Sequence, residues 1–240
     1  MIKPHWPAPA SVRAAVTERD GGVSSGAYAS FNLGAHVGDV PAAVTANRRR
    51  LKRVLELPAE PAWLEQVHGT RIVDLDEDSP GVADAAVTSR SDRVCVVLTA
   101  DCLPVLFASR DGARIGAAHA GWRGLLGGVL PQAVARMGVA ADALYAWLGP
   151  AIGAARYEIG AEVYEAFVAA APPYAQYFVP TRPGHWRADL YGLARASLAQ
   201  AGVSAVFGGG WCTYTEEQRF FSHRRAAPCG RMATLIWLAA

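Results

Sequence analysis

The stretch LTADCLPVLFASRDGARIGAAHAGWRG, residues 98–124, places a carboxylate, a thiol and an imidazole at the ends of apolar runs. Asp101 and Cys102 end the first run, and His119 ends a later one, directly before a Gly-Trp-Arg-Gly turn. His68 has a similar position in the segment EQVHGT. Zinc accepts cysteine thiolate and histidine nitrogen, and sites on a sheet gather at the ends of neighbouring strands. The residue types therefore point to a metal site made of His68, Cys102 and His119.

The spacing of these residues leaves a second interpretation open. Their separations are not those of a zinc finger, and a cysteine in an apolar run is often a small buried hydrophobic residue. Each histidine, taken alone, could equally be a hydrogen-bonded interior or surface residue. Asp101 is different, because a carboxylate inside an apolar stretch must find partners or reach solvent. From spacing alone, a site and a set of well-packed polar residues are both compatible with the pattern.

The composition is that of a globular chain. It has 240 residues, which suits one large domain or two small ones. Of these residues 52% are hydrophobic and 18% are charged, which supplies material for a core and argues against disorder. The formal net charge of +2 argues against a general electrostatic grip on DNA or RNA.

Features that would place the chain outside the cytoplasm are missing from the sequence. The N-terminus lacks a signal-peptide pattern, and the most apolar run, VCVVLTADCLPVLFA, is too short to span a bilayer. The four cysteines form no CxxC pair and need not be disulfides. We therefore expect a cytoplasmic protein with reduced thiols and with no membrane or nucleic-acid partner. Without a linker, a repeat or a heptad seam, one domain over residues 1–240 and a monomeric state are expected.

Hydrophobic patterning predicts a strand-rich centre with helices before and after it. Short apolar or alternating runs bounded by turn residues predict strands over residues 11–19, 62–67, 71–75, 83–89, 94–100, 104–109, 113–120, 143–149, 204–209 and 233–239. Helical spacing predicts helices over residues 39–57, 122–138, 160–172 and 189–202. We expect Asp39 to cap the first helix, Pro131 to kink or divide the second, and Gly202 to end the last. This pattern favours a mixed α/β or α+β fold with helix-covered sheets.

Ten stretches of the chain resemble one bacterial family almost from end to end. They are GGVSSGAYASFNLGAHVGD, NRRRL, EQVHGT, ADAAVTS, TADCLPVLF, AAHAGWRG, LGPAIG, YEIG and the late pair FFSHRR and GRMA. The pair TADCLPV and HAGWRG is the most specific part of the match. The chain resembles the bacterial laccase-domain family, first labelled multicopper polyphenol oxidases. Members of that family are now associated with purine nucleoside phosphorylase activity and with peptidoglycan editing.

The resemblance implies a fold, a metal and a substrate class. The fold would be α+β, a single-domain layered α/β/β/α sandwich with mixed sheets. One zinc would be held by His68, Cys102 and His119, with a purine nucleoside bound beside it. The implied activities are phosphorolysis of adenosine, inosine or methylthioadenosine, and deamination of adenosine. Zinc in such a site activates water, which suits deamination.

Other side chains are candidates for binding the nucleoside and phosphate. Arginine suits phosphate because it makes bidentate, charge-assisted hydrogen bonds. The arginines in matching or late basic segments are Arg48, Arg123, Arg224, Arg225 and Arg231, and each could instead be solvent-exposed. Asn32 and Gln66 could hydrogen-bond a nucleoside or only tie down a turn. Asp101 could relay a proton or orient a ligand, which would make Asp101, Cys102 and His119 the catalytic set. His36 is a further pocket candidate.

Three other functions remain open at this stage. In a cysteine hydrolase that edits peptidoglycan precursors, Cys102 would be the nucleophile and His119 the base. A copper-dependent polyphenol oxidase would need more ligands, and the chain has six histidines and no HxH pair. Thiolate and imidazole do bind copper well, so copper remains a possible cofactor beside zinc. A binding protein with a structural zinc would normally show a fourth ligand.

Overall fold

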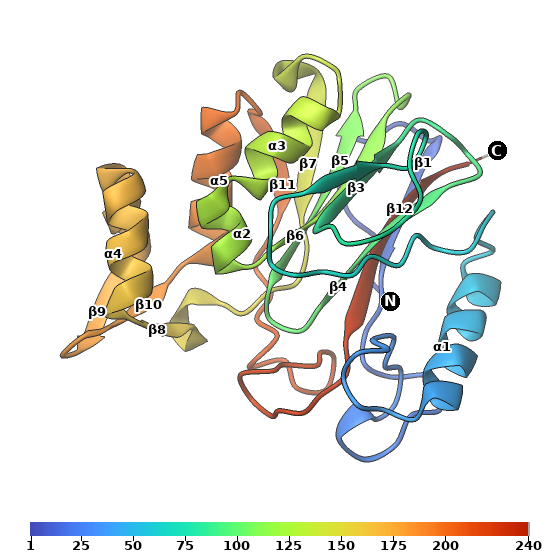
Figure 1. Ribbon diagram of the computed structural model, residues 1–240, viewed down its shortest axis with the longest axis horizontal. Coiled ribbons are helices and arrows are strands. Elements are labelled where there is room, and N and C mark those ends of the chain that lie inside the picture. The colour runs from blue at the N-terminus through green and yellow to red at the C-terminus, as the bar shows by residue number, and fades with distance from the viewer. Residues whose placement is uncertain (240) are drawn as a thin grey trace.

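The computed structural model describes residues 1–239, and at its centre lies a six-stranded mixed sheet (Figure 1). Its strand order is β11-β7-β5-β6-β3-β2. The β11/β7 and β3/β2 pairs are parallel and the remaining pairs are antiparallel. The strands are β2 (Ile72–Asp74), β3 (Ala85–Thr88), β5 (Leu103–Ser109), β6 (Ile115–Ala120), β7 (Leu144–Leu148) and β11 (Ala205–Gly208).

A second, antiparallel sheet packs against the first. It has the order β1-β12-β4, with β1 at Val12–Val16, β12 at Met232–Leu238 and β4 at Val94–Thr99. Helix α1 (Pro41–Val54) covers its outer face, whereas α2 (Trp122–Gly127), α3 (Val129–Arg136) and α5 (Leu190–Gln200) cover the opposite face of the six-stranded sheet. The layers therefore run α/β/β/α, which confirms the α+β layered fold expected from the sequence.

The long apolar runs form strands that are buried on both faces. Along β5, Val105 and Phe107 pack towards the helices, and Leu106 packs into the core between the sheets. Along β4, Cys95 faces the core between the sheets and Val96 faces α1. Successive strand side chains point to opposite faces, so a strand with two covered faces reads as an unbroken apolar run. This explains why the two runs around Asp101 are so apolar.

A third sheet and one helix form an arm at the side of the molecule (Figure 1). The arm contains β8 (Glu158–Gly160), α4 (Ala161–Ala170), β9 (Phe178–Arg182) and β10 (His185–Ala188), with strand order β8-β10-β9. The sequence predicted α4 and none of these strands. They are short, and β9 is mostly exposed and contains Pro180, so they lack the apolar alternation on which strand prediction depends.

The strand predicted over residues 62–67 is wrong. This segment makes two isolated bridges, Ala62 with Cys95 and Glu65 with Val82. The Trp63 N–H turns back to the Pro61 carbonyl at 2.9 Å and interrupts any ladder. The segment instead bonds to the second sheet through the Gln66 side chain, which pairs with the backbone of Leu98.

Two helix boundaries differ from their predicted form. The predicted 122–138 helix is divided at Gly128, which has a φ of 88°, and not at Pro131. Pro131 lies in the first turn of α3, where a missing N–H costs little. Val40 is the N-cap of α1, because the Asp39 carboxylate instead accepts hydrogen bonds from Ser24 and Asn32. α5 does end before Gly202, which has a φ of 88°, as predicted.

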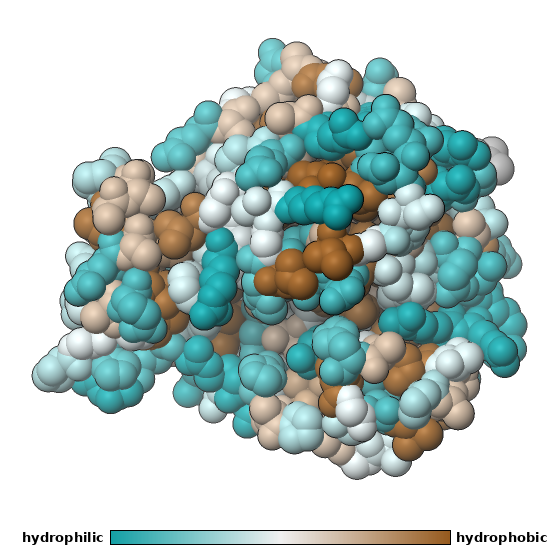
Figure 2. Space-filling view, in the orientation of Figure 1, coloured by the Kyte–Doolittle hydropathy of each residue, from teal (hydrophilic) through white to brown (hydrophobic). Residues whose placement is uncertain are grey.

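The remaining regular elements are short 3-10 helices at Gly26–Tyr28, Ala141–Ala143, Ala154–Arg156 and Pro172–Tyr177. Over residues 1–239, no helix combines the length and the apolarity needed to cross a membrane. Hydrophobic residues on the face shown in Figure 2 form small patches separated by hydrophilic ones.

Candidate metal centre

The three predicted ligands meet at the open end of the β5–β6 hairpin. The antiparallel register pairs Leu103 with Ala120 and Pro104 with His119, which brings Cys102 next to His119. Cys102 itself lies where the chain crosses from β4 in one sheet to β5 in the other. His68 comes from the loop before β2. One ligand atom from each of the three side chains lies within 4.8 Å of the others.

The donor set and its spacing fit a zinc ion. The Cys102 Sγ and His68 Nε2 atoms are 3.7 Å apart. Bonds of about 2.0 and 2.3 Å at a tetrahedral angle would place two such atoms about 3.5 Å apart. His119 is buried, Cys102 is partly exposed and His68 is exposed, so the cluster opens to solvent on the His68 side. Within the described part of the chain the group has three members, which suits a site with one open position.

Gly121 leaves room for the cluster. A Cβ atom at this position would lie 3.0 Å from Cys102 Sγ and 3.0 Å from His68 Cδ2. The backbone of Gly121 has an ordinary φ of −69°, so the requirement for glycine comes from this close approach and not from its conformation. The first glycine of the Gly-Trp-Arg-Gly turn is therefore required because the turn packs directly against Cys102 and His68.

Asp84, which was not among the predicted site residues, connects the cluster to the sheet. The residue immediately precedes β3, and its side chain is fully buried. Its Oδ1 accepts from the His68 backbone N–H at 2.9 Å and lies 2.8 Å from His119 Nδ1. Its Oδ2 accepts from the Val67 and Gly69 N–H groups at 3.2 and 2.6 Å. The sequence signal was a carboxylate at the start of the buried run AAVT, which must find partners.

Charges within the cluster shift the ionisation of its members. Burial raises the pKa of the Cys102 thiol, but positive His119 and hydrogen bonds from both histidines outweigh burial and lower that pKa to about 6. Burial lowers the pKa of His119, but the Cys102 thiolate and the Asp84 carboxylate outweigh it and raise that pKa to about 9. Opposite charges at close range stabilise each other's ionised forms. The metal-free cluster therefore favours thiolate beside imidazolium near neutral pH.

Both carboxylate oxygens of Asp101 are hydrogen-bonded to the late segment of the chain. It is a buried non-glycine residue with a φ of 95°, a conformation that side chains rarely adopt. Its Oδ1 accepts from the Thr213 hydroxyl at 2.6 Å and its Oδ2 accepts from the Arg224 backbone N–H at 2.7 Å. Asp101 thus ties the late segment to the residue that precedes Cys102, and its proposed part in catalysis stays a prediction.

Tyr157 and Arg224 lie beside the cluster. Tyr157 is largely buried, and the Arg224 guanidinium carbon lies 5.3 Å from the centre of its ring. Burial first, and then the negative charges of Cys102 and Asp101, raise the pKa of the Tyr157 hydroxyl, which keeps it a neutral donor. Arg224 also donates to the Glu158 carbonyl at 2.5 Å. Arg224 was a predicted site residue, whereas Tyr157 was not. The only signal for Tyr157 was its place in the matching segment YEIG.

Two of the predicted arginines lie in a second positive group. The Arg48 guanidinium donates to the Leu33 carbonyl at 2.8 and 3.0 Å and stacks over Trp63 at 3.9 Å. Arg231 donates to the Cys229 carbonyl at 2.9 Å. Burial, followed by the charges of Arg231, Arg48 and His119, lowers the pKa of His36. Arg48 and Arg231 therefore both act on His36 and disfavour its protonated form.

The other predicted contact residues have different placements. Asn32 is fully buried and bonds with Gly34, Asp39 and the Arg231 backbone N–H. Gln66 bonds with both the N–H and the carbonyl of Leu98, at 2.7 and 2.9 Å, in place of a backbone ladder. Both amides are thus bonded to backbone groups. Direct contact with a substrate stays a prediction for each.

Arg123 and Arg225 form a contrasting pair. Arg123 is exposed and stacks over Trp122 at 4.3 Å, and within residues 1–239 its guanidinium makes no hydrogen bond, so it is free to meet a ligand. Arg225 donates to the carbonyls of Thr213, Tyr214 and Phe220 and so stabilises the loop formed by residues 213–225.

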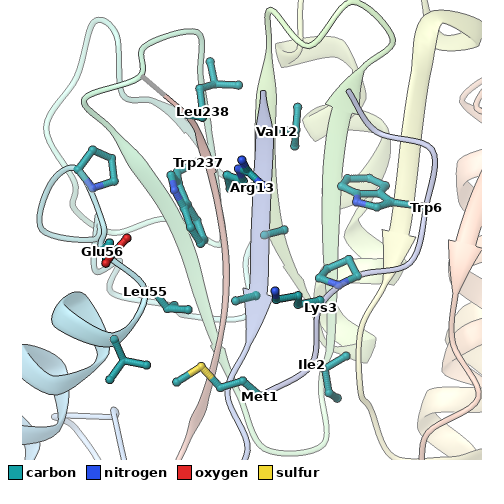
Figure 3. Close-up of a pocket in the computed structure, with 16 residues that line it drawn as sticks. Met1, Ile2, Lys3, Trp6, Val12, Arg13, Leu55, Glu56, Trp237 and Leu238 are labelled. Carbon is teal, nitrogen blue, oxygen red and sulfur yellow. The ribbon is translucent and has the colours of Figure 1, made fainter. Parts of the chain in front are cut away.

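One cavity lies away from this cluster. It has a volume of about 880 Å³ and lies between the N-terminal segment, β1, the end of β12 and the end of α1 (Figure 3). Lys3, Trp6, Arg13, Glu56 and Trp237 are among its lining residues. None of the three candidate ligands lines it, so its size alone does not make it the place of the metal chemistry.

Comparison with known proteins gives matches along nearly the whole chain. The family described as multi-copper polyphenol oxidoreductase laccase matches residues 13–239. A purine nucleoside phosphorylase of Pseudomonas aeruginosa is 52% identical over 99% of this chain and 98% of its own length. The purine nucleoside phosphorylase YfiH of Escherichia coli is 48% identical, again over 99% and 98%.

Solved structures show the same fold. A Neisseria meningitidis protein with 48% sequence identity superposes with a TM-score of 0.96 and covers 100% of this chain and 99% of that one. YlmD from Geobacillus stearothermophilus, at 33% identity, has a TM-score of 0.90 and covers 96% of this chain and 93% of that one.

Proposed function

The chain belongs to the family described as multi-copper polyphenol oxidoreductase laccase, and from this premise we propose that it is a zinc-dependent purine nucleoside phosphorylase. The observation that carries the proposal is the His68–Cys102–His119 cluster, which is open to solvent on the His68 side. The names of relatives at 48% and 52% identity support the same activity. The proposed substrates are adenosine, inosine or methylthioadenosine together with phosphate, with adenosine deamination as a side activity.

His68, Cys102 and His119 would hold the zinc. A bound zinc ion would supply Lewis-acid chemistry in the open position beside the nucleoside. The Gly121 turn keeps space around the ligands, and the His119 ring is held by Asp84. The protein's own contribution is therefore a preorganised set of donors with solvent access on one side.

Phosphorolysis also requires a phosphate held in line with C1′ of the ribose. A phosphate oxygen forms a bond to C1′, the bond between C1′ and the purine nitrogen breaks, and the purine leaves with the electron pair and takes up a proton. Arg48 and Arg231 each use some of their N–H groups on backbone carbonyls and keep others for an anion. Tyr157, as a neutral phenol beside the cluster, supplies a donor on the nucleoside side.

Two alternatives are also compatible with the cluster: a metal-free cysteine hydrolase, and copper in place of zinc. The arrangement of Cys102, His119 and Asp84 matches a thiol, a base and an orienting acid, which favours a metal-free cysteine hydrolase acting on peptidoglycan precursors as the second candidate. Copper would also bind a thiolate and two imidazoles, so metal analysis has to distinguish it from zinc.

The direct test is release of hypoxanthine from inosine with and without phosphate. The proposal predicts release that depends on phosphate, with ribose 1-phosphate as the second product, and its loss in Cys102→Ala. Release at the same rate without phosphate would indicate hydrolysis and contradict phosphorolysis. No purine release, together with cleavage of a peptidoglycan precursor by the metal-free protein, would support the cysteine hydrolase instead.

Arg48→Ala tests the phosphate site. Losing charge-assisted hydrogen bonds worth about 1.5–3 kcal/mol should raise the KM for phosphate by about 10-fold or more. The KM for inosine should change much less. Arg49→Ala, on the exposed face of the same helix, is the matched control and should leave both values unchanged. An equal rise of both KM values in Arg48→Ala would indicate a general role in folding or nucleoside binding.

A further inference from the structure

A single buried carboxylate oxygen contacts both histidines of the cluster. Asp84 Oδ1 accepts the backbone N–H of His68 at 2.9 Å and lies 2.8 Å from the Nδ1 atom of His119. The two histidines are far apart in sequence, and their rings meet at a centroid distance of 4.7 Å and an angle of 75°. One oxygen of Asp84 therefore positions both histidines relative to each other.

On the His119 side, Asp84 determines which ring nitrogen is free. A carboxylate can only accept a hydrogen bond, so the Nδ1 atom of His119 must carry a proton. Nε2 is then the nitrogen left to face Cys102 and a metal. The backbone N–H of His119 also donates to the Asp84 carbonyl at 2.7 Å, which fixes the main chain beneath the ring.

On the His68 side, Asp84 holds an unusual backbone conformation. His68 has a φ of 60°, in the left-handed region that non-glycine residues rarely occupy. The carboxylate accepts from three successive N–H groups, those of Val67, His68 and Gly69. Such a cradle offsets the backbone strain and directs the His68 side chain towards Cys102.

We propose that Asp84 is the positioning residue that joins the two histidine ligands, setting the ring of His119 and the backbone of His68 through one carboxylate. The inference rests on the metal site of the proposed function, but it concerns how this chain builds that site before any ion binds. Metal ligands held by a hydrogen-bonded carboxylate typically lose 10–100-fold in metal affinity when that partner is changed.

Asp84→Asn tests this proposal directly, because asparagine keeps the side-chain shape but replaces one acceptor oxygen by an NH₂ donor. If the amide oxygen replaces Oδ1, the amide NH₂ faces the N–H groups of Val67 and Gly69, and two donors then oppose each other. In the reverse orientation the NH₂ faces His68 N–H and His119 Nδ1. The first orientation loses two of the four hydrogen bonds. The second loses the bond to His68 and keeps the bond to His119 only if the ring proton moves from Nδ1 to Nε2, the nitrogen that would face the metal.

Asp74→Asn is the matched control. Asp74 lies on β2, is 4% exposed, and pairs with Arg114. It is a second buried carboxylate on a neighbouring strand, and it contacts none of the three ligands. A general effect of losing a buried charge should therefore appear in both variants.

The first readout is the dissociation constant for zinc alone, measured by competition with a chromophoric chelator. The proposal predicts an increase of about 10–100-fold for Asp84→Asn and a change of less than about 3-fold for Asp74→Asn. Unchanged affinity in Asp84→Asn, or an equal loss in both variants, would overturn it.

The second readout uses the unsubstituted, metal-free protein, so it does not depend on a variant that folds. Nitrogen-15 NMR of the histidine rings well above pH 9, where the His119 ring is neutral, should show its single ring proton on Nδ1, hydrogen-bonded to Asp84. An unprotonated Nδ1 would overturn the proposal. If the unsubstituted protein binds no zinc, the zinc part of the proposed function fails, while this NMR result still decides the role of Asp84.

Discussion

Gly121 determines how closely the turn after β6 approaches the cluster. A methyl group here would lie 3.0 Å from the sulfur of Cys102 and 3.0 Å from a ring carbon of His68, two of the candidate ligands. Contacts this short force a neighbour to move, and metal ligands tolerate only small displacements from a productive geometry. The glycine is therefore part of the site although it offers no functional group.

Gly121→Ala should lower the zinc affinity by about 10-fold or more, comparable to the loss of a supporting contact around a ligand. Gly81→Ala is the control, since a Cβ there would meet nothing within 4 Å and its φ is ordinary. Titration with zinc checks both variants. Equal affinities in Gly121→Ala and the unsubstituted protein would show that the turn is not packed against the ligands as described.

The residues of the cluster could be predicted from type and position, but their partners could not. His68, Cys102 and His119 each followed a strand-like run, whereas Asp84 lay inside the predicted 83–89 strand and was given no role. Predicting Asp84 would have required knowing that the 65–69 loop lies over β3, a contact between segments distant in sequence. Asn32 and Gln66 were selected as substrate contacts, and the structure shows their amides bonded to backbone groups.

At the scale of elements, the edge of the six-stranded sheet is held by carboxylates. Asp76, in the turn after β2, accepts hydrogen bonds from Thr88 and Ser89 at the end of β3 and from Arg114 before β6. Although burial raises its pKa, these hydrogen bonds and the positive charge of Arg114 outweigh burial and lower it. The ionised side chain therefore joins three strands.

This shift predicts an acid-dependent loss of stability. A carboxyl whose pKa is lowered by folding stabilises the protein above its unfolded pKa, near 3.8, and this contribution is lost as the pH falls through the folded value. Asp76→Asn should therefore flatten the fall of the unfolding free energy below about pH 4. Urea unfolding at pH 7 and at successively lower pH checks this. A slope identical to that of the unsubstituted protein would contradict the linkage.

Elements with strong patterns were predictable and those set by tertiary contacts were not. β4, β5 and β6 appeared as apolar runs because both of their faces are covered. The 62–67 segment has a similar composition, but Pro61 and a turned-back Trp63 N–H prevent a ladder. The division of the second helix at Gly128 followed from its left-handed backbone, which outweighed the visible signal of Pro131.

At the scale of the whole molecule, the layers explain where the cluster lies. The chain crosses between the two sheets at residues 100–102, so Cys102 stands at the junction of both layers and the late 209–231 segment. The Asp101 hydrogen bonds to Thr213 and to the Arg224 N–H tie that segment to the junction. The layered order was expected through the family resemblance, since the order of strands could not be read from the pattern. One domain and a monomeric state stay predictions.

The most direct measurement is the metal content of the purified, tag-free protein and of Cys102→Ala by inductively coupled plasma mass spectrometry. About one zinc per chain is expected in the unsubstituted protein and little in Cys102→Ala, because the two remaining histidines bind zinc weakly. A full equivalent of zinc retained by Cys102→Ala would contradict the ligand assignment. A metal-free unsubstituted protein with a readily alkylated Cys102 would contradict the zinc site itself.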